Sequence, residues 1–261
     1  MKTKLLDTLT FSEKRENLLI LLKDGPKTLE DIRTSLNVTS SGMIPQIRKL
    51  EEQNLVRREG KNYALTDMGA IITSVFVPLV KTIDIFEKHE DFLKNHDIEA
   101  IPPHLLNRIY DLGNCRLVES NISEIYEPHM DFFEALSKSK KVMGIAPIFH
   151  YSYPPFFLKL AQSGVEVSLL LTHDVFDKIK KEYRPMLDEY LSLPNASLYV
   201  SDEKIKLASA VSDSFFSISL FFKTGGYDSQ KDLVSQDESA VKWGRELFDH
   251  FMQKSSRVNS L

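Results

Sequence analysis

A single cysteine, Cys115, is the first scarcity in this sequence of 261 residues. One thiol excludes an internal disulfide and a zinc site built from several cysteines. It leaves an intersubunit disulfide open as a redox sensor. A lone cysteine beside Arg116 is nevertheless more typical of a small packed residue than of such a sensor.

Long apolar runs are also missing. No run approaches the roughly 20 residues that a helix needs to cross a bilayer, and Met1 to Asp7 lack the apolar core of a signal peptide. The sequence has neither a glycine-rich phosphate loop nor a metalloprotease motif. We therefore expect a cytoplasmic protein that contacts no membrane and holds no metal ion or other cofactor.

Positive charge is scarce as well, since the net charge at pH 7 is −4. The charges are unevenly spread along the chain. Residues 1–65 hold 12 Lys and Arg against 9 Asp and Glu, a net of +3, whereas residues 66–261 hold 21 against 28, a net of −7. Only the N-terminal part is suited to nucleic-acid phosphates, and dimerisation would double that basic surface.

Residues 24–65 follow the element order of a winged helix-turn-helix. Gly25-Pro26 ends an apolar helix, and Thr28 can cap a second helix with acidic residues in its first turn. After a turn at 37–39, Ser40 or Ser41 can cap a third helix. The apolar residues of this helix recur at spacings of four and three, at Met43, Ile47 and Leu50. Pro45 predicts a kink, or a regular helix that begins only near that residue.

A basic hairpin follows, with a strand at 55–58, a turn at 59–62 and a returning strand at 63–65. In winged helices the third helix enters the major groove of DNA. We expect double-stranded DNA to contact the exposed face of this helix and the hairpin. The residues concerned are Ser40, Ser41, Pro45, Gln46, Arg48, Lys49, Arg57, Arg58 and Lys61. The alternative is an interaction adaptor that uses the winged helix to bind protein.

A helical segment connects this module to the rest of the chain. Thr66 to Gly69 can cap a helix whose apolar residues are spaced four, three, four and three, as in a heptad seam. We expect a homodimer contact through Ile72, Phe76, Leu79, Ile83 and Phe86. The alternative is a helix that packs on its own domain. Pro78 predicts a kink or a division of the helix. The polar groups at 89–91 and 95–97 are interpreted as solvated rather than metal-binding.

From about residue 100 the pattern alternates between helices and strands, which indicates a mixed α/β sheet with helices on its faces. The expected strands are 115–118, 142–146, 165–171, 196–200, 207–211 and 215–222, and the expected main helices are 124–138, 154–163, 174–191 and 238–254. The predicted fold class is therefore α+β. Its parts are a winged helix-turn-helix domain at 1–68, a helical linker and dimerisation segment at 69–97, and an α/β domain at 98–261.

Three parts of the sequence carry a resemblance to a known family: residues 43–50, residues 170–176, and residues 226–228 with 239–248. The N-terminal module resembles the ArsR-type winged-helix regulators of methanogenic archaea. The C-terminal half resembles the methanogenesis-regulator domain attached to them. The resemblance covers nearly the whole chain, and it implies an archaeal transcription factor without implying an effector.

The C-terminal topology also resembles, distantly, a phospholipase-D-type α/β half. Catalysis in that superfamily needs a histidine nucleophile followed two residues later by a lysine. His150-Tyr151-Ser152 and His173-Asp174-Val175 both lack that lysine. We therefore expect a regulator rather than an enzyme, and a phosphodiesterase remains only a weaker alternative.

Aromatic and hydrogen-bonding groups gather where two expected strands end. Residues 148–155 follow one strand and residues 172–174 leave the next, at the sheet edge where α/β folds bind ligands. Two helices that begin nearby would add N–H donors for an anion. We expect a small polar or anionic metabolite to bind at His150, Tyr151, Tyr153, Thr172 and His173, and to alter DNA affinity. The alternative is that these residues only pack the sheet edge of a scaffold or assembly domain.

Overall fold

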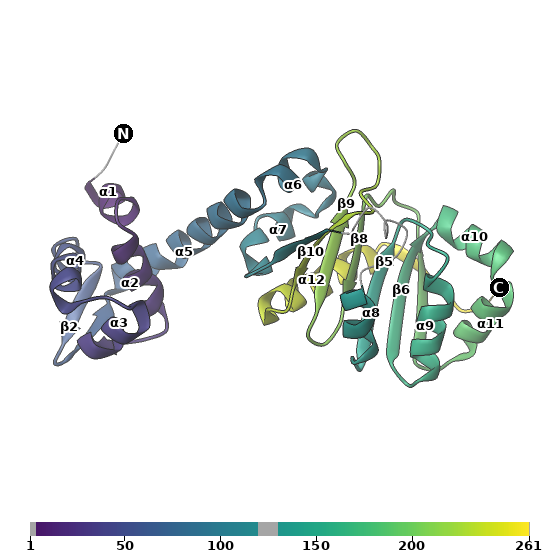
Figure 1. Cartoon of the computed structure of the whole chain (residues 1–261), viewed down its shortest axis with the longest axis horizontal. Coiled ribbons are helices and arrows are strands. Elements are labelled where there is room, and N and C mark those ends of the chain that lie inside the picture. Colours follow the sequence, from purple (N-terminus) through teal and green to yellow (C-terminus); the bar gives the residue numbers. More distant parts are fainter. Residues whose placement is uncertain (1–3, 120–129, 261) are drawn as a thin grey trace. The chain divides into compact units, whose positions relative to one another are not determined.

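The computed structural model describes residues 4–119 and 130–260. The chain divides into two compact units, Met1–Lys81 and Thr82–Leu261. The boundary falls inside a single long helix. Both units contain helices and strands, so the fold is mixed α+β (Figure 1).

The N-terminal unit combines short helices with a small antiparallel sheet. Its elements are α1 (Lys4–Thr10), α2 (Glu13–Lys23), β1 (Lys27–Thr28), α3 (Leu29–Leu36), α4 (Ser40–Glu52), β2 (Val56–Glu59) and β3 (Asn62–Leu65). The strand order is β1-β3-β2. Leu18, Leu19, Ile32 and Met43 are fully buried, so α2, α3 and α4 share one apolar core.

Local sequence determines where α3 and α4 begin. The Asp31 backbone N–H donates to the Thr28 hydroxyl at 3.1 Å, and the Thr28 N–H donates to the Asp31 carboxylate at 2.9 Å. This capping box confirms the predicted cap. Asn37 ends α3 in the left-handed conformation, with a φ of 49°. The cap of α4 is Thr39, whose hydroxyl accepts from the Gly42 N–H at 3.2 Å. The predicted cap at Ser40 or Ser41 is therefore wrong by one or two residues.

Pro45 lies inside α4 without delaying its start, because the helix runs from Ser40 to Glu52. A proline at this place removes one N–H from the helical hydrogen bonds. The buried residues Met43, Ile47 and Leu50 hold both parts of the helix against the core. A helix that begins near Pro45, one of the two predicted solutions, is not what the structure contains.

The helix α5 (Asp67–Lys88) is the longest in the described part of the chain. The Gly69 N–H donates to the Thr66 hydroxyl at 2.9 Å, which confirms the predicted start. Pro78 does not divide the helix. Its most apolar window has a mean hydropathy of 1.7, so by length and composition alone it is long and apolar enough to cross a bilayer, contrary to the expectation from sequence. One such helix is weak evidence for a membrane span, and part of it packs into the N-terminal core through Ile72 and Phe76.

The C-terminal unit is built around one large sheet. After α5 its elements are α6 (Glu90–Asn95), two 3-10 turns (Ile98–Ala100 and Ile109–Leu112), α7 (Pro103–Leu106), β4 (Arg116–Glu119), α8 (Met130–Ser137), β5 (Lys141–Ala146), α9 (Tyr153–Gln162), β6 (Glu166–Thr172), α10 (His173–Glu182), α11 (Arg184–Ser192), β7 (Ala196–Ser201), β8 (Leu207–Val211), β9 (Phe216–Leu220), β10 (Lys231–Ser235), α12 (Glu238–Met252) and β11 (Ser255–Val258).

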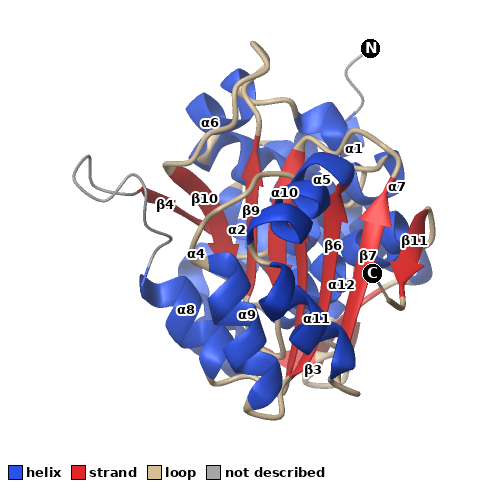
Figure 2. Ribbon diagram, turned by 90° about the vertical axis from the view of Figure 1, so that its right-hand side faces the viewer, coloured by secondary structure: helices blue, strands red, loops and turns tan. Residues whose placement is uncertain are grey.

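The eight strands lie in the order β11-β7-β6-β5-β8-β9-β10-β4. Strands β5, β6 and β7 pair in parallel, and the remaining pairs are antiparallel. Helices α8, α9 and α11 cover one face of the sheet, and α12 lies behind it in Figure 2. Each face has its own apolar core: Val167 and Leu171 pack toward α9 to α11, and Phe216 packs toward Trp243 of α12.

The structure corrects the expected C-terminal elements in three places. The helix predicted at 174–191 is two helices, α10 and α11, which meet at Tyr183 just before Pro185. Proline near a helix start favours the new helix. The strands β10 and β11 were not predicted from the sequence, because both are short and largely polar. Residues 124–129 of the helix predicted at 124–138 lie outside the described residues.

Candidate functional sites

The helix α4 presents a hydrophilic face opposite its buried face. Ser41, Pro45, Arg48 and Lys49 are exposed, whereas Ser40 is half-buried. Residues three and four apart lie on the same side of a helix. The exposed face therefore carries a hydroxyl and two cationic side chains, which are groups that reach phosphates and base edges.

Gln46 is less available than the sequence suggests. Arg15 Nη1 donates to Gln46 Oε1 at 2.8 Å, and the Ser12 hydroxyl lies 3.5 Å from the same oxygen. Arg15 is buried, and its Nε donates to the Thr8 carbonyl at 2.5 Å. The amide oxygen of Gln46 therefore joins α4 to α2 within the unit.

The β2–β3 hairpin carries three exposed cations. Arg57 pairs with Glu59 at 2.7 Å, and Arg58 Nε donates to the Gly60 carbonyl at 3.0 Å. Lys61 is exposed in the turn. Gly60 has a φ of 63°, a conformation that glycine adopts without strain and that the tight turn requires. The hairpin is thus a compact element with cationic side chains at its end.

The apolar residues of α5 face in two directions. Ile72 and Phe76, which the sequence assigns to a dimer contact, pack instead into the N-terminal core. Leu79, Ile83 and Phe86 are exposed, as a dimer contact needs. The exposed apolar residues of α5 recur every four, four, four and three positions, at Ile71, Val75, Leu79, Ile83 and Phe86. We call these five residues the α5 stripe. In the first half of α5 the exposed apolar residues are therefore Ile71 and Val75, each one position before the predicted Ile72 and Phe76.

A cavity of about 50 Å³ lies in the C-terminal unit near the carboxyl ends of β5 and β6. It is lined by Ala146, Ile148, Phe149, His150, Tyr153, Pro154, Phe157, Leu169, Leu171, Val175, Ile179, Met186, Leu187, Tyr190 and Leu198. We call it the α9–α11 cavity. His150 and Tyr153 are the two predicted ligand-binding residues that line it.

The other three predicted ligand-binding residues do not line this cavity. Tyr151 is exposed and stacks on His150, with ring centroids 4.6 Å apart. His173 is exposed, and its Nε2 lies 2.7 Å from Asp202 Oδ1. Thr172 is the N-cap residue of α10. The five residues therefore do not form one polar site.

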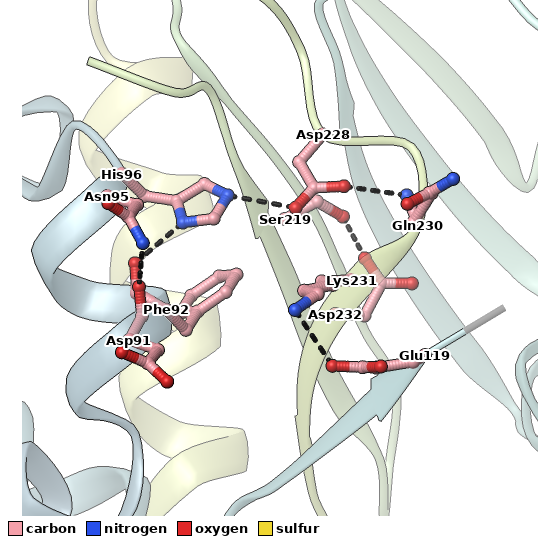
Figure 3. Close-up of polar contacts among 10 residues, drawn as sticks. All are labelled: Asp91, Phe92, Asn95, His96, Glu119, Ser219, Asp228, Gln230, Lys231 and Asp232. Carbon is pink, nitrogen blue, oxygen red and sulfur yellow. Dashed lines mark hydrogen bonds and ion pairs between the residues drawn. The ribbon is translucent and has the colours of Figure 1, made fainter.

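A polar cluster that the sequence does not reveal lies around β9, β10 and the end of α6 (Figure 3). His96 Nε2 lies 3.0 Å from Asp228 Oδ2, the Ser219 hydroxyl donates to the Asp232 carboxylate, and Lys231 pairs with Glu119 at 2.9 Å. The sequence interpretation of residues 89–91 and 95–97 as solvated is wrong for His89 and His96, which are buried.

Two phenols lie close to this cluster. Burial raises the pKa of Tyr153 and Tyr227 well above the ordinary value, and the negative charge of Asp232 adds to the effect for both residues. Both side chains are therefore neutral hydrogen-bonding groups at physiological pH.

Cys115 and the histidines form no metal site in the part of the chain that the structure describes, which contains no group of three His, Cys, Asp or Glu able to hold a metal ion. Cys115 Sγ lies 3.4 Å from His89 Nε2. Burial raises the pKa of the Cys115 thiol to about 11. A protonated thiol is a poor nucleophile, which argues against a redox role.

Comparison with known proteins gives matches in both units. The model described as "Methanogenesis regulatory protein FilR1, N-terminal domain" matches residues 3–84, and the corresponding middle-domain model matches residues 125–254. The methanogenesis regulatory protein FilR1 of Methanothrix harundinacea (strain 6Ac) is 30% identical over 254 residues, which are 95% of this chain and 56% of that protein. The chain thus spans about half the length of the curated relative that it matches.

Solved structures give weaker likenesses. TrmBL2, described as an archaeal chromatin protein with a novel mode of DNA binding, aligns with 96% of this chain and 97% of its own, at 14% identity and a TM-score of 0.44. The phospholipase D family member Nuc from Salmonella typhimurium aligns with 56% of this chain and 99% of its own, at 9% identity and a TM-score of 0.41. Neither likeness establishes what this chain binds.

Proposed function

Because the matches in both units identify the chain as a FilR1-like regulatory protein, we propose that it is a cytoplasmic, DNA-binding transcriptional regulator. The regulator family agrees with the methanogenesis-regulator part of the resemblance noted above. Within this proposal the N-terminal unit is an ArsR-like winged helix-turn-helix at residues 1–68, with α3 and α4 as the helix-turn-helix and the β2–β3 hairpin as the wing.

One observation carries the proposal. The exposed face of α4, with Arg48 and Lys49, and the cationic end of the hairpin, with Lys61, belong to the same compact unit. A helix with its apolar side buried and cations on the other side is the element that winged helices insert into the major groove. The net charge of +3 on residues 1–65 favours phosphate binding by this part of the chain, whereas the remainder of the chain is acidic.

In vitro selection tests this function without knowledge of the target. The full chain is incubated with random double-stranded DNA at low salt, and bound sequences are enriched over several rounds. We expect an enriched, inverted-repeat motif whose affinity falls steeply with salt. If no sequence is enriched and binding does not depend on salt, the proposal fails.

A protein-interaction adaptor is the second candidate, and one observation favours it. The oxygen of Gln46 and the guanidinium of Arg57 already have partners inside the unit, so fewer groups are available for base reading than the sequence indicates. The same selection separates the two functions, because an adaptor would enrich no DNA sequence.

The α5 stripe supports a homodimer. Its members are 38–69% exposed, and a water-exposed row of large apolar side chains marks an interaction surface. Two copies of α5 packed along this row would cover it. A dimer would also place two DNA-binding units on an inverted repeat.

Residues 69–97 then serve as linker and dimerisation segment, and residues 98–261 as a domain that senses a small molecule or mediates assembly. The α9–α11 cavity supports sensing, because it lies where α/β folds bind ligands. A ligand that favours one arrangement of the dimer would change DNA affinity.

A further inference from the structure

The walls of the α9–α11 cavity are of one chemical kind. The lining side chains come from β5, β6, β7, α9, α10, α11 and the segment that follows β5. They are aliphatic, aromatic, methionine, proline or histidine side chains, and none of them is Asp, Glu, Lys or Arg. A charged ligand would therefore lose its hydration without gaining a counter-charge from an Asp, Glu, Lys or Arg side chain in these walls.

Two of the polar groups on the lining residues, the Tyr190 hydroxyl and His150 Nδ1, have protein partners. Tyr190 donates its hydroxyl to the carbonyls of Val167 and Ser197, at 3.0 and 3.1 Å. His150 Nδ1 lies 2.7 Å from the Ser152 hydroxyl. Tyr190 thus holds its polar end on the backbone of β6 and β7, and its ring forms part of the cavity wall.

The volume of the cavity also indicates which kind of molecule can occupy it. Its volume is about 50 Å³, whereas a single water needs about 10–15 Å³ by the same kind of measure together with two to four polar partners. The cavity is therefore larger than one water requires, and its apolar walls offer few hydrogen bonds. Such a cavity favours apolar occupants over water.

An anion is disfavoured at the nearby helix start as well. The sequence suggests that the first turn of α9 donates N–H groups to a ligand. That turn contains Pro154 and Pro155, and proline has no backbone N–H. The polar or anionic ligand expected from the sequence therefore does not match this site.

We propose that the α9–α11 cavity binds a neutral, apolar small molecule, such as an aromatic ring or a short alkyl group. Ile148 and Met186 line the cavity and are each 37% exposed, so the ligand enters beside them. Phe149 also lines the cavity, and Lys178 Nζ lies 4.4 Å from the centroid of its ring. The regulatory purpose of the ligand rests on the proposed function, but its binding requires no DNA.

The test uses the full chain with toluene and 1-hexanol as neutral probes and benzoate as the charged counterpart of toluene. We expect at least one neutral probe to raise the unfolding midpoint in a concentration-dependent way, and to shift the methyl NMR signals of Leu171 and Val175. Benzoate at the same concentration should do neither. Absence of binding by both neutral probes, or equal binding of benzoate, overturns the proposal.

Two variants locate the binding. Ala146→Leu fills the cavity from β5 and should weaken probe affinity at least about tenfold, which corresponds to about 1.4 kcal/mol. Ala208→Leu is the matched control, because Ala208 is also a half-buried strand alanine but does not line the cavity. Leu171→Phe is the second filling variant should Ala146→Leu not fold. If a cavity-filling variant folds and still binds the probe with unchanged affinity, the probe does not bind in this cavity.

A DNA titration with and without the bound probe separates this inference from the proposed function. Probe binding that leaves DNA affinity unchanged upholds the cavity as a ligand site and contradicts its role in regulation. Failure of DNA binding altogether contradicts the proposed function and leaves the probe experiment unaffected.

Discussion

His96 and Asp228, which are 132 residues apart in sequence, form a buried pair with Nε2 and Oδ2 3.0 Å apart and side-chain exposures of 2% and 3%. The other ring nitrogen, Nδ1, lies 2.6 Å from the Phe92 carbonyl and must donate to it, since a carbonyl only accepts. The Gln230 N–H donates to Asp228 Oδ1 at 2.9 Å, so the pair ties the end of α6 to the segment before β10 (Figure 3).

We expect Asp228→Ala to destabilise the protein by about 1–3 kcal/mol, because it leaves a buried imidazole nitrogen without a hydrogen-bond partner. Asp228→Asn should recover part of this stability, since an amide N–H can donate to a neutral imidazole. Urea unfolding measures both. Asp202→Ala is the control, because it breaks an exposed His–Asp pair worth about 0–1 kcal/mol. Equal destabilisation by the two alanine variants would contradict the prediction.

Gly244→Ala should lower the free energy of unfolding by about 1–3 kcal/mol because it disturbs the packing of α12, although alanine is the better helix former. A Cβ at Gly244 would lie 2.3 Å from Phe216 Cδ2, inside the buried Phe216–Trp243 contact. Gly226→Ala is the matched control, because its nearest contact would be Phe222 Cδ2 at 3.9 Å. Thermal unfolding of the two variants compares them directly. A Gly244→Ala protein of unchanged stability would show that Phe216 can shift to make room for the added methyl group.

Cys115 should react slowly with iodoacetamide in the native protein. At pH 8 a thiol with a pKa of about 11 is ionised about 100-fold less than one at the ordinary value of 9.0, and only the thiolate reacts. The folded state binds this proton more tightly, so the stabilising contribution is complete below about pH 9 and is lost as the pH rises toward about 11. Alkylation rates in buffer and in urea provide the measurement. Comparable rates at pH 8 would reopen a redox role.

The N-terminal helices and the hairpin follow from local sequence, because caps and turns act over a few residues. Thr28 and the α5 start at Thr66 are examples. Partners distant in sequence are not visible in this way. Nothing near Gln46 indicates that Arg15 binds it, and nothing near His96 indicates Asp228.

The same reason explains the errors at the α5 stripe and at the ligand site. Helical spacing identifies apolar faces, but Phe76 and Val75 are neighbours, and only tertiary packing decides which of them is buried. Residues 148–155 look polar in sequence because His150, Tyr151 and Ser152 are there. In the structure, apolar side chains of α10, α11 and β6 complete the cavity wall, and these come from later in the chain.

Val75→Asp should yield a folded monomer if the α5 stripe is the dimer contact, because a charge in a buried apolar interface costs several kcal/mol. Ser74→Asp is the control, since Ser74 is the exposed neighbour outside the stripe. Phe76→Asp should instead unfold the N-terminal unit, because Phe76 lies in its core. Light scattering with circular dichroism distinguishes these outcomes. A folded Val75→Asp variant of unchanged mass would exclude the stripe as the interface.

Lys49 and Lys61 test the proposed DNA surface, one on α4 and one at the hairpin turn. Removing one lysine–phosphate ion pair should reduce the slope of log affinity against log salt by about 0.9. Lys49→Ala with Lys61→Ala should therefore lower the slope by about 2 for each bound protomer, or about 4 for a dimer, and weaken binding to all sequences alike. Lys23→Ala removes an exposed cation outside this surface and should change neither. Gln46→Ala should lower both stability and DNA affinity, because the same amide anchors Arg15. Unchanged affinity and salt slope in the double lysine variant would mean that α4 and the hairpin do not face the phosphates.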